Sequence, residues 1–146
     1  MNKKRLLVVG GSGLLGTKLL KNANNYELYS TFKKNSIDFE NVETMKLDIT
    51  NKKDCRKILD IEPDFIVNTA AMTNVDHCER FKEDAYNVNV NGTKNLADIA
   101  QQLGSKFIQI SSDMVFSGGN NFSERDKPNP ANVYGKTKLE SLSNNR

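Results

Sequence analysis

The feature that most constrains the fold is a run of glycines directly after a short apolar segment near the start of the chain. Residues 5–9 read RLLVV, and residues 10–16 read GGSGLLG. An apolar run closed by glycine predicts a buried strand that ends in a tight turn. Leu15, Leu19 and Leu20 follow at helical spacing and predict a helix beyond the turn. A strand, a glycine turn and a helix in this order are typical of the first unit of a dinucleotide-binding sheet.

Apolar runs and helical patterns continue to alternate along the rest of the chain. Four further strands are expected at residues 27–32, 42–47, 65–67 and 107–110. Helices are expected around residues 54–59, along residues 85–103 with Gly104 at the C-terminal end, and after Asn129-Pro130. The residues after Glu140 are poor helix formers, so we expect the last helix to fray there. Alternating strands and helices predict a doubly wound parallel α/β sheet of the Rossmann type.

Length and composition favour a single globular domain over residues 1–146 and exclude several other classes of protein. The net charge is +3 and the basic residues are scattered, which argues against nucleic-acid binding. No apolar run is long enough to span a membrane, and the run at residues 5–9 is too short for a signal peptide, so a cytoplasmic location is expected. Cys55, Cys78 and the single His77 lack the spacing of metal ligands, and no metal site is predicted.

The glycine turn predicts where a dinucleotide binds. Glycines at 10 and 13 are expected to let the backbone turn tightly and approach a pyrophosphate, which then meets the N–H groups at the start of the helix. Gly16 is expected to let this helix lie close to the strand. The cofactor-binding residues predicted in this turn are Gly10, Ser12, Gly13, Leu14, Leu15 and Gly16.

The end of the second strand bears on which dinucleotide is bound. It reads Ser30-Thr31-Phe32-Lys33-Lys34 and lacks the acidic residue that would hold a ribose 2′-OH. Lys33 and Lys34 can neutralise a 2′-phosphate, or they are solvated charges of a loop. NADPH is therefore the preferred cofactor and NADH the alternative.

Tyr134 and Lys138 are spaced i and i+4 and so project from one face of the last helix. A lysine ammonium beside a tyrosine favours the phenolate, so the tyrosine can give its proton to a carbonyl oxygen that receives a hydride. A hydroxyl at the end of the fifth strand could polarise the same carbonyl. Ser112 is the first choice for this role and Ser111 the second.

Four segments together resemble the dTDP-4-dehydrorhamnose reductases of the extended short-chain dehydrogenase/reductase family. They read GGSGLLG, VNTAAMTNVDHCE, AYNVNVNGTKNLA and SSDMVFSGG…FSERDKPNPANVYGKTKLE, and span nearly the whole chain. The resemblance implies Ser112, Tyr134 and Lys138 as catalytic residues, with Asp113 and Met114 beside the substrate. It also implies dinucleotide contacts at Asp48, Ile49, Ala70, Ala71, Thr73, Asn89, Tyr134 and Lys138.

The reaction implied by the resemblance is reduction of the 4-keto group of a dTDP-linked 6-deoxy sugar, in the synthesis of dTDP-L-rhamnose for surface polysaccharide. Two residues depart from the family. Ser112 stands where a threonine is usual and keeps the hydroxyl, whereas Met114 stands where a tyrosine is usual and leaves the identity of the sugar open. Related dehydratases have a glutamate at the position of Met114, which argues against elimination chemistry. Related epimerases more often carry an acidic residue after the second strand.

A non-catalytic alternative comes from the NADP-binding regulatory subunit of methionine adenosyltransferase, which is similar to these reductases. The intact motif residues favour an enzyme lineage. Extended reductases have about twice this length, so the chain is expected to be the cofactor-binding half, without the substrate domain. It should bind NADPH and reduce a sugar nucleotide poorly or not at all. A homodimer is compatible with the resemblance.

Overall fold

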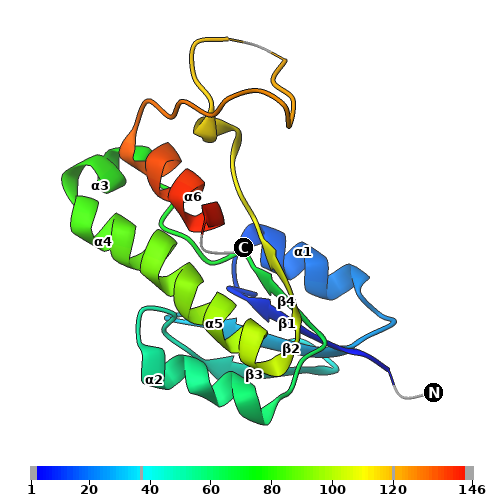
Figure 1. The fold of residues 1–146 in the computed structure, drawn as a ribbon. Coiled ribbons are helices and arrows are strands. Elements are labelled where there is room, and N and C mark those ends of the chain that lie inside the picture. The colour runs from blue at the N-terminus through cyan, green and yellow to red at the C-terminus, as the bar shows by residue number, and fades with distance from the viewer. Residues whose placement is uncertain (1–2, 37, 120, 144–146) are drawn as a thin grey trace.

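A computed structural model describes residues 3–36, 38–119 and 121–143. One parallel sheet has the strand order β3-β2-β1-β4-β5 (Figure 1). The strands are β1 (Arg5–Val9), β2 (Glu27–Phe32), β3 (Val42–Lys46), β4 (Phe65–Asn68) and β5 (Lys106–Gln109). The predicted Rossmann-type α/β fold is confirmed. Because the strand order reverses direction between β1 and β4, a crevice is expected at the carboxyl ends of these two strands.

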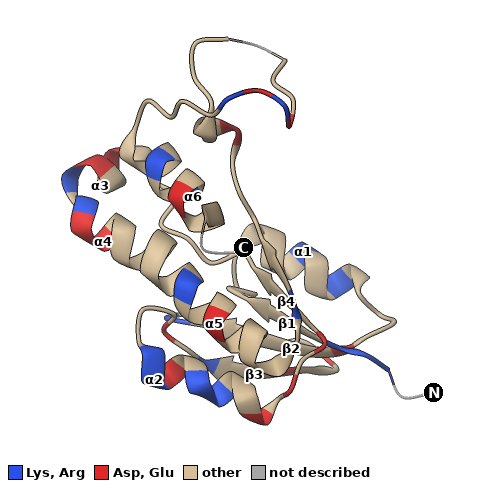
Figure 2. Ribbon diagram, viewed as in Figure 1, with Lys and Arg blue, Asp and Glu red and all other residues tan. Residues whose placement is uncertain are grey.

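Helices cover both faces of the sheet. The α-helices are α1 (Leu14–Asn22), α2 (Lys52–Cys55), α3 (Val75–Arg80), α4 (Lys82–Tyr86), α5 (Thr93–Leu103) and α6 (Val133–Ser143). Short 3₁₀ helices form at η1 (Arg56–Asp60) and η3 (Asp113–Val115), and η2 (Asn87–Gly92) is a π-helix. Figure 2 shows that the charged residues of both signs lie mainly on these helices and loops. Among the described residues, no helix has the length and apolarity needed to cross a membrane.

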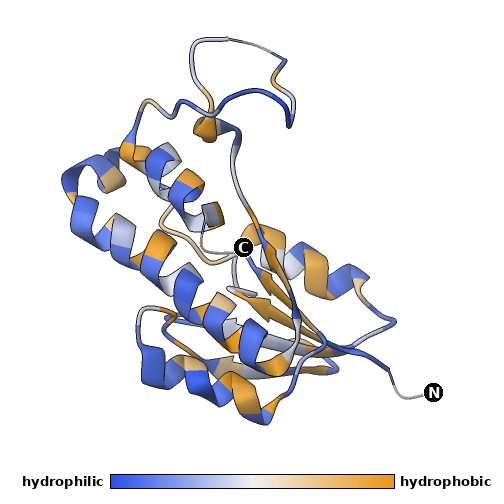
Figure 3. Cartoon of the chain, viewed as in Figure 1, coloured by the Kyte–Doolittle hydropathy of each residue, from blue (hydrophilic) through white to orange (hydrophobic). Residues whose placement is uncertain are grey.

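Alternate residues of the central strand bury their side chains on opposite faces, as the pleat of a strand requires. Leu7 and Val9 pack with η1 and α5 on one face, through Ile58 and Leu96. Leu6 and Val8 pack on the other face, where the neighbours include Leu20 of α1 and Leu28 of β2. Both faces of the strands are therefore apolar, and Figure 3 colours the central strands largely as hydrophobic. This explains why residues 5–9 read as a nearly continuous apolar run and not as an alternating one.

The long helix predicted over residues 85–103 differs from the structure in its start and its regularity. It begins at Lys82 and is interrupted by the π-helix η2 before α5 continues. At Gly92, the last residue of η2, an added Cβ would lie 2.6 Å from Ile49 Cγ1. The helix therefore passes very close to the segment after β3. The apolar periodicity gave no sign of the π-turn.

The predicted start of the last helix at Asn129-Pro130 is wrong. The backbone N–H of Asn129 donates to Val115 O, and its side chain accepts from Ser117 N at 2.9 Å, so Asn129 closes the preceding loop. The helix starts at Val133, and Asn132 caps it by accepting from Gly135 N at 2.7 Å.

The fraying predicted after Glu140 is also wrong as far as Ser143. Ser141 is buried, and its hydroxyl donates to Lys138 O at 2.7 Å, which satisfies the polar group that makes serine a poor helix former. Residues 144–146, the remainder of that prediction, lie outside the described residues.

Candidate functional site

A cavity of about 330 Å³ opens at the carboxyl ends of the strands, where the strand order reverses. It is lined by the segments that follow β1, β2, β3 and β4. The predicted cofactor residues that line it are Gly10, Ser12, Gly13, Lys33, Lys34, Asp48, Ile49, Ala70 and Ala71. Residues far apart in the sequence thus share one crevice, at the place where α/β sheets bind ligands.

The glycine turn packs tightly under this cavity. Gly10 has φ +79°, which favours glycine, and an added Cβ would lie 2.9 Å from Ala70 N. At Gly16 a Cβ would lie 2.6 Å from Gly10 O, so the close approach of α1 to the turn requires glycine, as predicted.

Gly13 departs from the reason predicted for it. Its φ is −77°, and an added Cβ would meet only Gly10 O at 3.4 Å, so the turn itself does not need glycine there. The role that stays as a prediction for Gly13 is to let a ligand approach the backbone.

The start of α1 can bind an anion. Gly13 is the N-cap and provides no side chain to bond the N–H groups of the first turn. The next residue, Leu14, is 86% exposed, so no apolar contact covers this end of the helix. Backbone N–H groups and the helix dipole favour a negative charge at such a place. The residues present therefore fit the pyrophosphate of a dinucleotide.

Lys33 and Asp48 form an ion pair at one side of the cavity. Lys33 Nζ lies 2.8 Å from Asp48 Oδ2, and both side chains are partly exposed. Asp48 Oδ1 accepts from Thr50 N at 3.0 Å and from the Thr50 hydroxyl at 2.8 Å. Partial burial raises the pKa of the Asp48 carboxyl, but the hydrogen bonds from Lys33 and Thr50 outweigh this effect and hold the pKa below its ordinary value. The Asp48 carboxyl is thus ionised at neutral pH, and Lys34 is exposed beside the pair.

Helix α6 brings Tyr134 and Lys138 to the end of β5. Lys138 is 3% exposed, and its Nζ donates to Ile110 O at 2.5 Å. Burial lowers the pKa of this amine to about 8. At neutral pH the amine is still mostly protonated. Tyr134 is half-buried against the cluster of Cys78, Ala85 and Val133.

Ser112 lies between two points at which α6 touches the segment after β5. One point is the bond from Lys138 to Ile110 O. The other is Gly135, whose added Cβ would clash with Met114 O, so that only glycine allows this approach. Ser112 Oγ accepts from Met114 N at 3.2 Å and donates to Asp113 Oδ1 at 3.2 Å. The serine thus caps η3, and Ser111 beside it is exposed.

Seven of the residues predicted to contact the cofactor do not line the cavity: Leu14, Leu15, Gly16, Thr73, Asn89, Tyr134 and Lys138. Asn89 is 1% exposed, and its amide accepts from Met72 N at 2.8 Å and donates to Met72 O and to Thr137 Oγ1. It joins the loop after β4 to α6. Thr73 is exposed on the same loop. Their contacts with a cofactor stay predictions.

Sequence reasoning missed polar residues that shape the crevice. Thr31 Oγ1 accepts from Gly10 N at 3.2 Å, and the Thr69 hydroxyl donates to Val9 O at 2.8 Å. Asn68, which is fully buried, donates to Gln109 Oε1 at 2.8 Å and accepts from Ala70 N at 3.1 Å. The available signal was their position, because each lies at or just after the carboxyl end of a strand.

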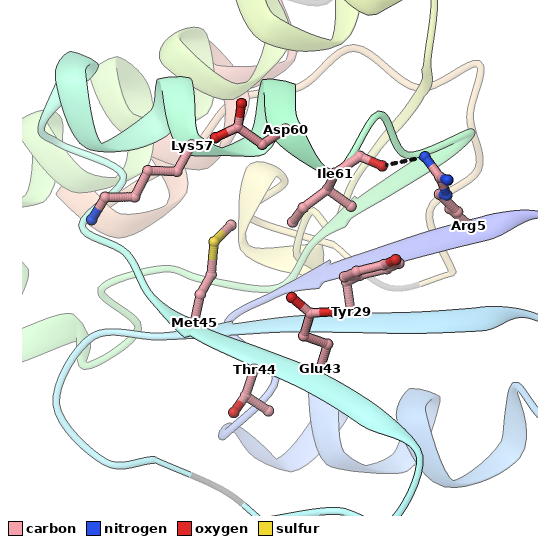
Figure 4. Close-up of a pocket in the computed structure, with 8 residues that line it drawn as sticks. All are labelled: Arg5, Tyr29, Glu43, Thr44, Met45, Lys57, Asp60 and Ile61. Atoms are coloured by element: carbon pink, nitrogen blue, oxygen red, sulfur yellow. Dashed lines mark hydrogen bonds between the residues drawn. The ribbon is translucent and has the colours of Figure 1, made fainter.

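A second cavity of about 330 Å³ lies between η1 and the strands, lined in part by Arg5, Tyr29 and Glu43 (Figure 4). Arg5 begins β1, so this cavity lies away from the strand ends that carry the glycine turn. The guanidinium of Arg5 donates to Ile61 O at 2.9 Å and is close to Glu27 and Glu62. The positive charge of Arg5 is thus already paired with carboxylates. The residues predicted to bind a cofactor line the first cavity. In the described part of the chain, no three His, Cys, Asp or Glu residues gather as metal ligands.

Comparisons with known proteins agree with this geometry. The family model described as the RmlD substrate binding domain matches residues 4–142. The chain is 39% identical over 142 residues to the dTDP-4-dehydrorhamnose reductase of Aggregatibacter actinomycetemcomitans, covering 93% of this chain and 45% of that protein. It is 38% identical over 141 residues to the methionine adenosyltransferase 2 subunit beta of Bos taurus, covering 94% of this chain and 41% of that protein.

Among solved structures, the chain resembles the dTDP-4-dehydrorhamnose reductase of Bacillus anthracis, which was solved in complex with NADP. The TM-score is 0.83 at 30% identity, covering 98% of this chain and 49% of that one. The chain therefore spans about half the length of the relatives it matches.

Proposed function

The chain belongs to the family of the RmlD substrate binding domain, and on this basis we propose that it is the dinucleotide-binding part of an NADP(H)-dependent reductase. The proposed substrate is a 4-keto-6-deoxy sugar linked to dTDP, of the dTDP-4-dehydrorhamnose type, reduced to a dTDP-L-rhamnose type of product. The similarity to the A. actinomycetemcomitans reductase supports the substrate class. The Met114 departure leaves the individual sugar open.

One observation carries the proposal. Helix α6 contacts the segment after β5 on both sides of Ser112, through Lys138 on Ile110 O and Gly135 against Met114 O. This contact brings the helix that carries Tyr134 to the same edge of the sheet as the crevice beside the uncapped α1. We propose on this basis that Tyr134, Lys138 and Ser112 face a common region in which a carbonyl group and a dinucleotide meet.

The proposed chemistry uses these three side chains. A bound NADPH would supply the hydride for the keto carbon. The Tyr134 hydroxyl donates its proton to the keto oxygen, which becomes the hydroxyl of the product, and solvent later returns a proton to the tyrosine. The Ser112 hydroxyl donates a hydrogen bond to the same oxygen and polarises the carbonyl. Protonated Lys138 is proposed to stabilise the phenolate and to hold the nicotinamide ribose.

The proposed cofactor is NADPH in preference to NADH. Lys33 and Lys34 at the cavity provide positive charge for a 2′-phosphate, and the end of β2 provides no carboxylate for a ribose 2′-OH. The NADP complex of the B. anthracis reductase supports this class of cofactor. Asp48 and Ile49 at the same cavity are proposed to contact the adenine.

The test is to titrate the purified protein with NADPH and then to add dTDP-4-dehydrorhamnose while the nicotinamide absorbance is followed. We expect NADPH binding by residues 1–146, and little or no NADPH oxidation when the sugar nucleotide is added. Tyr134→Phe should retain NADPH binding but lose about 10²- to 10⁴-fold of any such activity, the usual contribution of a positioned proton donor. Failure to bind NADPH would refute the proposal.

A second candidate function is a non-catalytic NADP-binding regulatory subunit. The 38% identity to the methionine adenosyltransferase 2 subunit beta favours it nearly as strongly as the match to the reductase favours the first candidate. Retention of Ser112, Tyr134 and Lys138 at one sheet edge supports the enzyme. A full-length form that binds NADPH and never oxidises it with any dTDP-4-keto sugar would favour the regulatory subunit.

A further inference from the structure

The first turn of α6 is held by a side chain from a distant element. Helix starts leave backbone N–H groups without intrahelical partners. The local cap, Asn132, takes the N–H of Gly135. The N–H of Val133, the first residue of α6, donates instead to Glu79 Oε1 at 2.7 Å. Glu79 lies in α3, 54 residues earlier in the sequence.

Helix α3 is itself firmly anchored beneath this bond. Asn74 caps it by accepting from His77 N at 2.8 Å. Cys78, which precedes Glu79, is fully buried and packs with Val133 in one apolar cluster. Its thiol also contacts Met72 O at 3.5 Å. The backbone that leads to Glu79 is therefore held by the cap at Asn74 and by the buried Cys78, and the Glu79 carboxylate meets α6 from this anchored helix.

We infer that Glu79 is a positioning residue that fixes the start of α6, and with it Tyr134 and Lys138, relative to Ser112 and the bound dinucleotide. This inference rests on the proposed function. A carboxylate at a helix N-terminus forms a charge-assisted hydrogen bond and interacts favourably with the helix dipole. Tyr134 directly follows the residue that Glu79 holds. A shift of this turn therefore displaces Tyr134, the proposed proton donor. It displaces the residues that line the cavity beside the glycine turn less.

The geometry separates the two ends of a dinucleotide. The crevice beneath the glycine turn is lined by segments after β1, β2, β3 and β4, together with Val88, and by no residue of α6. Loss of the Glu79 bond should thus weaken a ligand that reaches Tyr134 and Lys138, but leave unchanged a ligand that fills only the crevice. NADPH is the first kind of ligand, and adenosine 2′,5′-bisphosphate is the second.

The experiment compares Glu79→Ala, Glu79→Gln and the control Glu83→Ala, an exposed carboxylate of the neighbouring α4. We expect Glu79→Ala to weaken NADPH binding by about fivefold, the size of a lost helix cap, with no change for adenosine 2′,5′-bisphosphate. Glu79→Gln keeps an acceptor oxygen and should restore most of the affinity. Glu83→Ala should change neither ligand. Equal weakening of both ligands by Glu79→Ala, or no effect on either, would overturn the inference.

Hydrogen exchange provides a readout without any ligand. Glu79→Ala should speed the exchange of amides at residues 133–136 and leave those of α1 as in the parent protein. If neither ligand binds the parent protein, the proposed function fails, and the exchange data still decide the role of Glu79. Unchanged exchange at residues 133–136 would overturn it.

Discussion

Replacement of Asp48 by asparagine should raise the preference of the protein for NADPH over NADH. In the structure Lys33, a candidate partner for a 2′-phosphate, is held by Asp48 with 2.8 Å between Nζ and Oδ2. The substitution removes the negative charge that competes for Lys33. It keeps Oδ1 as the acceptor for the backbone N–H and hydroxyl of Thr50, so the turn after β3 should be preserved.

The expected size follows from the exposure of the pair. The Lys33 side chain is 54% exposed and that of Asp48 is 33% exposed. Two unit charges at such a distance attract each other by about 1.5 kcal/mol in bulk water. Side-chain entropy and salt reduce measured values for exposed pairs to about 0.2–1 kcal/mol. Releasing Lys33 should therefore increase the ratio of NADPH to NADH affinity by about 1.5- to 5-fold.

Equilibrium titration of the parent protein and Asp48→Asn with both dinucleotides measures this ratio directly. Any contact of residue 48 with adenine is common to the two ligands and cancels in the ratio. Lys33→Gln is the matched variant and should lower the ratio of NADPH to NADH affinity. When Lys33→Gln is already present, adding Asp48→Asn should change this ratio less, as a double-mutant cycle requires for two residues that interact. The gain should also decrease in high salt. A ratio that is unchanged or lower in Asp48→Asn would refute the reasoning.

Two further predictions concern α6. Burial lowers the pKa of Lys138 to about 8 from its ordinary 10.5, so between these pH values the unfolded chain binds more protons and the free energy of unfolding should rise with pH. Denaturant titrations at several pH values should show this rise in the parent protein and not in Lys138→Met. Identical pH profiles of the two proteins would contradict the prediction. Gly135→Ala should destabilise the protein by about 1–3 kcal/mol, because the new Cβ meets Met114 O, although alanine is the better helix former by about 1 kcal/mol. Gly104→Ala is the control for a glycine replaced without a steric clash, since a Cβ there meets nothing within 4 Å and only the backbone φ of +69° at the end of α5 is strained. A Gly135→Ala variant as stable as the parent would show that α6 can shift away from η3.

Short-range patterns in the chain predicted the fold and much of the crevice. An apolar run and a glycine turn are local features, and the five strands were expected close to where β1 to β5 lie. Because parallel strands place their carboxyl ends at one edge, residues after β1, β2, β3 and β4 could be expected to meet there. Nine of the residues predicted to bind a cofactor do line the cavity. Their roles in binding stay proposals.

Helix boundaries were less predictable, for a physical reason. Asn129-Pro130 and Asn132 both suit a helix start, and the loop contacts of Asn129 with Val115 and Ser117 decide between them. Likewise, serines at the end of α6 count against a helix only where their hydroxyls lack partners. Ser141 has one inside the helix, in a buried position. Propensity is a small energy that such contacts override.

The pairs that assemble the candidate site link elements whose relative placement no local pattern encodes. Glu79 with Val133, Asn89 with Thr137, and Lys33 with Asp48 join residues between 15 and 54 positions apart. Each depends on the packing of one helix or loop on another, and a shift of one residue turns a helical side chain by about 100°. Residue types and their order were therefore sufficient to predict a dinucleotide fold with a tyrosine and a lysine on one helix. Long-range packing was needed to show that α6 reaches the end of β5 and which side chains hold it there.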